Sequence, residues 1–174
     1  MRPRLTRLAA GLVFGTALLT ACGGGSTNGG EGQKTLRSGD IAFEVDFLGA
    51  EKETGEVRRG GTVTNPPSGH SWWAFELRVK NVSAKELLSA STPDVAVACG
   101  DDDAADVEAV NNPGFVMGKA PYATGTLDNG ASNTGVVPLA VPDGTTDCRF
   151  IVRMDPLHDP DEPEILEFKF DTEG

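Results

Sequence analysis

The sequence predicts an all-β protein whose residues 35–174 form an antiparallel β-sandwich of about seven strands. Short segments alternate apolar and polar residues with a period of two, which is typical of strands that bury one face. Turn residues separate these segments, and spacers long enough for helices are missing, so parallel βαβ units are not expected. The chain also contains 22 glycines and 11 prolines, and its 174 residues suffice for one globular domain.

The alternating segments follow one another along the whole domain. Their apolar positions are Ile41, Phe43, Val45 and Phe47; Trp73, Phe75, Leu77 and Val79; Val95, Val97 and Cys99; Val137, Leu139 and Val141; Cys148, Phe150, Val152 and Met154; and Leu166, Phe168 and Phe170. We expect these side chains to form the core, because successive residues of a strand point to opposite faces. The residues between them, such as those at 72, 74, 76, 78 and 80, are expected to face solvent.

Two features of the later segments concern their place in the sheets. Pro142-Asp143-Gly144 combines a fixed φ with a residue that adopts positive φ readily, which predicts a tight hairpin between the strands on either side. Pro138 has no amide hydrogen to donate within a sheet. Its strand is therefore expected at an edge or at a bulge.

The N-terminal residues 1–21 have the pattern of an export signal. Three arginines precede an apolar run that is shorter than the roughly 20 residues of a membrane-spanning helix. Leu19-Thr20-Ala21-Cys22 resembles the lipobox of bacterial lipoproteins, which implies lipid attachment to Cys22 and cleavage before it. Residues 22–34 contain no large apolar side chain and predict a flexible tether. We expect a protein anchored to the cell membrane by lipid, on its extracytoplasmic face.

The charge balance limits the partners of the exported domain. The chain has 15 basic and 26 acidic residues and a net charge of -11. The signal contains three of the 15 basic residues and no acidic ones, so the mature chain keeps 12 basic against 26 acidic residues, a net charge of -14. Nucleic acid is excluded as a partner, because it is bound through basic surfaces. The expected partners are the membrane, through the lipid on Cys22, and another envelope protein.

Two motifs resemble a known family. The alternating segment 75–83 ends in Asn81-Val82-Ser83, and the segment 135–142 begins with Gly135 and ends in Val141-Pro142. Both are similar to signatures of the immunoglobulin-like domains of functionally uncharacterised Gram-positive lipoproteins, which are related in fold to a secreted mycobacterial immunoprotective antigen. The resemblance spans about residues 40–170 and implies an immunoglobulin-like β-sandwich. It implies no activity.

The mature chain retains two cysteines, Cys99 and Cys148. Outside the cytosol disulfides persist, so we expect these two residues to pair. A redox-active pair is the alternative, although it would lack the C-x-x-C spacing typical of such sites.

Acidic residues are densest at positions 101–108. Asp101, Asp103, Asp106 and Glu108 offer carboxylates to a hard cation such as Ca²⁺, which prefers several oxygen ligands from one loop. The loop lacks the glycine and glutamate positions of an EF-hand. The alternative is a solvated acidic loop that aids solubility.

The remaining candidate is Trp72, which alternation places on the face opposite Trp73. A loop covers its indole, or the indole is an exposed contact for a partner. The chain shows no nucleophile motif, zinc-binding motif or phosphate-binding loop, so we expect neither enzymatic activity nor a cofactor. Two functions follow. The first is a lipid-anchored protein-interaction module, and the second is a small-ligand or Ca²⁺-binding lipoprotein that uses the 101–108 loop.

Overall fold

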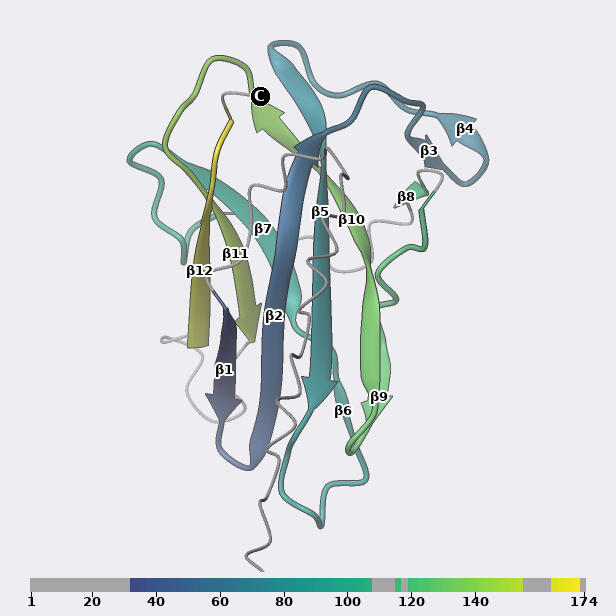
Figure 1. The fold of residues 1–174 in the computed structure, drawn as a ribbon, viewed down its shortest axis with the longest axis vertical. Helices are drawn as coiled ribbons and strands as arrows, with labels where there is room; N and C mark the ends of the chain where they lie inside the picture. The colour runs from purple at the N-terminus through teal and green to yellow at the C-terminus, as the bar shows by residue number, and fades with distance from the viewer. Residues whose placement is uncertain (1–31, 108–114, 117–118, 155–163, 173–174) are drawn as a thin grey trace, which may run out of the picture.

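The computed structural model describes residues 32–107, 115–116, 119–154 and 164–172, and their strands form two main antiparallel sheets (Figure 1). One sheet has the order β1-β2-β5-β10 and the other β12-β11-β7. Their bounds are β1 (Gln33–Ser38), β2 (Ile41–Lys52), β5 (His70–Asn81), β7 (Asp94–Cys99), β10 (Ser132–Pro142), β11 (Cys148–Met154) and β12 (Glu164–Phe170). The antiparallel sandwich is confirmed, with seven strands in its main sheets. Within the described ranges, no helix of the length and apolar character needed to cross a membrane occurs.

The order in which the strands are assigned to the two sheets differs from that of a constant-type immunoglobulin domain. β5 is the third main strand along the chain and pairs with β2, the second, in the same sheet. In constant-type immunoglobulin domains the third strand lies in the sheet opposite the second. The molecule therefore shares the sandwich architecture of immunoglobulin domains, but its second and third main strands lie in the same sheet. β1 begins at Gln33, two residues before the predicted start of the domain.

The core lies between the two sheets and consists mainly of the predicted apolar faces. Leu36, Ala50, Ala90 and Tyr122 join it without having been predicted, and Ile41, Val97 and Leu166 are only partly buried at its border. Phe47 and Phe75 of the four-stranded sheet meet Phe150 of β11, with ring centroids 5.2 and 4.9 Å apart. Phe168 and Phe170 of β12 complete this group of rings. Aromatic side chains bury large apolar areas, so these ring contacts contribute strongly to the core.

Two short ribbons flank the sandwich at opposite ends (Figure 1). One consists of β3 (Arg58–Arg59), β4 (Thr62–Val63) and β8 (Phe115–Val116), and the other of β6 (Ser89–Ser91) and β9 (Thr126–Asp128). Near the first ribbon, the outer face of β5 departs from the predicted solvent-facing pattern. Ala74 is buried there in a small second cluster with Val57 and Val136.

The turn at residues 142–144 forms as its residue types predict, but it does not make a hairpin. Gly144 has a φ of 77°. The strands on either side, β10 and β11, belong to opposite sheets, so the turn carries the chain across the sandwich. The expectation for Pro138 is confirmed, because β10 is an edge strand of the four-stranded sheet.

Candidate functional site

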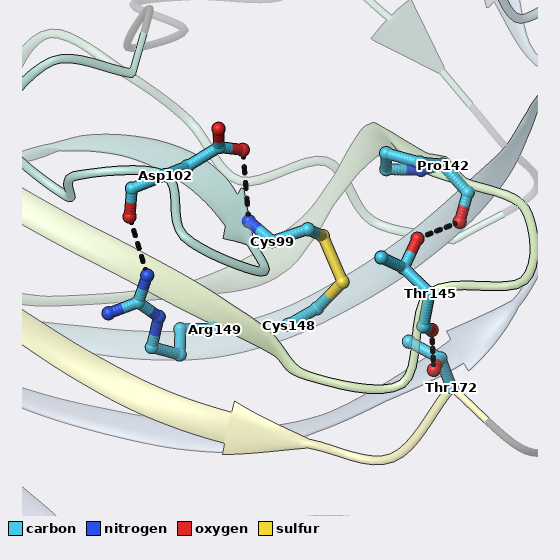
Figure 2. Close-up of a disulfide and its surroundings, with 7 residues drawn as sticks. All are labelled: Cys99, Asp102, Pro142, Thr145, Cys148, Arg149 and Thr172. Carbon is cyan, nitrogen blue, oxygen red and sulfur yellow. Dashed lines mark hydrogen bonds between the residues drawn. A yellow bond between two sulfur atoms is a disulfide. The ribbon is translucent and has the colours of Figure 1, made fainter.

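The disulfide between Cys99 and Cys148 links β7 to β11 (Figure 2), and the predicted pairing is confirmed. The two residues are direct register partners, with Cα atoms 4.1 Å apart. Both are buried. The bridge therefore fastens the end of the edge strand β7, from which the acidic loop departs.

The acidic loop turns two of its carboxylates toward its own backbone. Asp102 accepts a hydrogen bond from the Cys99 amide at 3.3 Å, and Asp103 accepts one from the Ala105 amide at 2.9 Å. Asp101 and Asp106 are exposed, and Glu108 lies outside the described residues. Within the described residues, no three His, Cys, Asp or Glu side chains gather as metal ligands.

Two arginines of β11 bind the carbonyl groups of this loop. Arg149 donates to the Asp102 carbonyl at 2.6 Å, as Figure 2 shows. Arg153 donates to the carbonyls of Ala105 and Val107 at 3.1 and 3.0 Å. A Ca²⁺ loop uses backbone carbonyls as ligands, whereas these three already accept from guanidinium groups. The loop acts as a cover over the small apolar cluster on the outer face of the three-stranded sheet.

The indole of Trp72 is covered by a neighbouring segment, which is one of the two arrangements that the sequence allowed. Its indole Nε1 donates to the Thr64 carbonyl at 3.0 Å, and its ring packs on the cluster of Val57, Ala74 and Val136. The side chain is half-buried. Trp72 therefore holds the β3-β4 segment against the sheet.

A β-bulge in β2 shapes a hollow on the outer face of the four-stranded sheet. The register between β2 and β5 shifts between Phe47 and Gly49, so Leu48 has no register partner. Leu48 is one of the exposed large apolar side chains, with 37% of its surface accessible. Bulges often redirect a side chain at functional sites. Here the bulge places a leucine at the lip of the hollow.

The hollow has a buried floor and an exposed, mostly charged rim. Its floor consists of Gly49, Ala50, Ala74 and Val136, and its rim of Leu48, Glu51, Glu76 and Lys119. Glu76 is the register partner of both Gly49 and Val136, so its carboxylate stands between β2 and β10. The Lys119 ammonium group forms an ion pair with the Glu51 carboxylate across the hollow.

Backbone contacts to β10 hold the segment that carries Lys119. The Val136 amide donates to the Ala120 carbonyl, and the Tyr122 amide donates to the Val136 carbonyl, both at 2.9 Å. This approach depends on Gly135, because a Cβ atom there would lie 2.4 Å from the Tyr122 nitrogen. The glycine of the second family-like motif therefore has a packing role, and it fixes one wall of the hollow.

Tyr122 anchors the same segment in the core. Its side chain is only 4% exposed, and burial raises its pKa far above the ordinary value of 10.0. The Asp94 carboxylate raises the pKa further, while the nearby Thr92 hydroxyl lowers it. Within the described residues, no hydrogen bond of good geometry reaches the phenol oxygen.

We expect the phenol of Tyr122, the only tyrosine of the chain, to stay neutral in the folded protein at about pH 11. The unfolded chain ionises near 10, so the stability that the buried neutral phenol contributes is present below that pH and is lost as pH rises above it. Ultraviolet titration of the phenolate band checks this, with the urea-unfolded chain as control. A phenolate signal with a midpoint near 10 in protein that keeps its native circular dichroism would contradict it.

Sequence reasoning missed the hollow. Its rim residues come from β2, β5 and the segment before Tyr122, and nothing in their local sequence connects them. Gly49 was the one available signal, because a glycine inside a strand pattern suggests a bulge.

Comparisons of the chain with protein-family models, with curated proteins and with solved structures find no match. The family resemblance thus stays a prediction from its two motifs.

Proposed function

We propose that the chain is an extracytoplasmic lipoprotein, anchored through Cys22, whose sandwich binds another envelope protein at the hollow beside Leu48. The observation that carries the proposal is the composition of the hollow. An apolar centre with a charged rim is the usual anatomy of a protein interface. The segment that precedes β1, residues 22–32, has the composition of a flexible tether and would let the domain turn this face toward a partner above the lipid surface.

The rest of the same sheet face supports a protein partner. Beyond the hollow, the pairs Asp46–Arg78 and Glu44–Lys80 form a ladder of opposite charges across β2 and β5. Such alternating charges favour a partner surface with complementary charges, and they discriminate against other partners more than they add affinity. In this proposal, contacts in the hollow would provide the affinity for the partner protein. The charge pairs would fix the position of the partner along the sheet.

Photo-crosslinking in intact cells tests the proposal. With a photo-crosslinking phenylalanine derivative in place of Leu48, we expect discrete adducts with one protein. The matched control is the same replacement at Leu88, a leucine that is 82% exposed and lies outside the hollow. A Cys22→Ser chain, which lacks the thiol for the lipid, should leave the membrane fraction and lose the adduct.

The adduct pattern decides the outcome. Equal adducts from both positions would mean unspecific proximity in a crowded envelope, and no adduct from position 48 would mean that the hollow has no protein partner. Either result would overturn the proposed function. Membrane retention of the Cys22→Ser chain would overturn its lipid anchor.

A further inference from the structure

The rim of the hollow carries more negative than positive charge. Glu51 and Glu76 both border it, and Lys119 is the one basic residue among its described lining residues. Lys119 pairs with Glu51, whereas the Glu76 carboxylate has no ion pair or hydrogen bond within the described residues. The hollow therefore has one carboxylate in use and one available, above a floor of buried apolar groups.

Lys119 demonstrates which side chain suits this site. Lysine and arginine lay an aliphatic stem on apolar surface while the charged head stays in water or meets a carboxylate. The internal pair is also weak, because the side chains of Lys119 and Glu51 are 43% and 59% exposed, and exposed ion pairs contribute little. A second cation is thus able to enter beside Glu76 or to displace Lys119.

We propose that the hollow binds a lysine or arginine side chain of the partner protein, with its stem on Ala74 and Val136 and its cation at Glu76 and Glu51. Charge complementarity favours this occupant, since the chain has a net charge of -11 and the two glutamates of the hollow outnumber its lysine. The inference rests on the proposed function and names the chemistry of the contact. Lys119 acts in it as an internal competitor.

Peptide titration of the full chain, purified from membranes in detergent, tests the inference. The probes are acetyl-Gly-Lys-Gly-amide, its arginine counterpart and the neutral glutamine counterpart, followed by NMR through the methyl groups of Ala74 and Val136. The basic peptides should shift these signals and the glutamine peptide should not. Lys119→Ala should tighten binding of the basic peptides about threefold, and Glu76→Gln should weaken it about threefold, the size expected for one exposed ion pair.

The matched control is Glu86→Gln, which removes an exposed carboxylate away from the hollow and should leave binding unchanged. Equal shifts with the glutamine peptide, or weaker binding by Lys119→Ala, would overturn the inference. Its failure is distinguishable from that of the proposed function. Adducts at position 48 without peptide shifts would leave a protein partner that uses other chemistry, whereas peptide shifts without adducts would leave a basic-group site without a protein partner.

Discussion

Replacing Cys99 and Cys148 together with serine should lower the free energy of unfolding by about 4 kcal/mol. The bridge closes a loop between residues 49 positions apart, and in the chain-entropy account it restricts the unfolded chain by that amount. Such a loss is a large fraction of the stability of a small domain. Urea unfolding under non-oxidising and oxidising conditions measures it, with the reduced wild-type chain as an independent route to the same difference.

The register of β7 and β11 sharpens this expectation. Because the ladder already places Cys99 opposite Cys148, the serine variant keeps the same strand pairing, and its native state needs no rearrangement. The loss should therefore appear as a lower denaturation midpoint with an unchanged fold by circular dichroism. A loss below about 1 kcal/mol would show that the unfolded chain is already compact around this loop.

The core faces were predictable because strand alternation is a local property. Phe75 and Leu77 are fully buried, as their spacing predicts, while Glu76 between them is exposed. The turn at Pro142-Asp143-Gly144 was predictable as a turn for the same reason. The sequence could not predict that this turn connects two different sheets, because turn residues indicate local φ and ψ values and not the sheet to which the next strand belongs.

Exceptions to the solvent-facing pattern have distant causes. Ala74 lies on the outer face of β5 and is buried, because Val57 and Trp72 pack over it. Strands as short as β3 and β4 contain two residues each, too few for any alternation to appear. For this reason the sequence could not predict that the β3-β4 segment covers Trp72, and it left two alternatives for this side chain.

The acidic loop illustrates what charge counting misses. Its aspartates suggested a cation site, since carboxylates dominate the local sequence. The groups that organise the loop are the guanidinium groups of Arg149 and Arg153, which reach it from β11 after intervals of 47 and 48 residues. The hollow poses the same difficulty, because the sheet register brings Gly49 and Val136 to either side of Glu76, and Lys119 joins them only through the backbone hydrogen bonds between its segment and Val136.

The second large effect is expected at Asn81, whose side chain is fully buried at the end of β5. Its Nδ2 donates to the Leu127 carbonyl at 2.8 Å. Its Oδ1 accepts from the Ser83 amide at 3.0 Å and from the Ser83 hydroxyl at 2.6 Å. The Ser83 hydroxyl in turn accepts from the Ala42 amide at 3.0 Å. The Asn81 side chain therefore joins β5 directly to β9 and, through Ser83, to the start of β2.

Asn81→Ala should therefore cost about 3 kcal/mol, because it leaves the buried Ser83 amide without its acceptor, at about 1–3 kcal/mol, and also removes the hydrogen bond to the Leu127 carbonyl, at about 1 kcal/mol. Asn133→Ala is the matched control. It removes the same side chain from β10, where the amide makes one hydrogen bond to the Ala123 carbonyl in an exposed setting, and it should cost less than about 1 kcal/mol. Urea unfolding of both variants measures the difference. Equal losses would mean that water replaces the Asn81 contacts, and the Asn81-Val82-Ser83 motif would then need an explanation other than this buried corner.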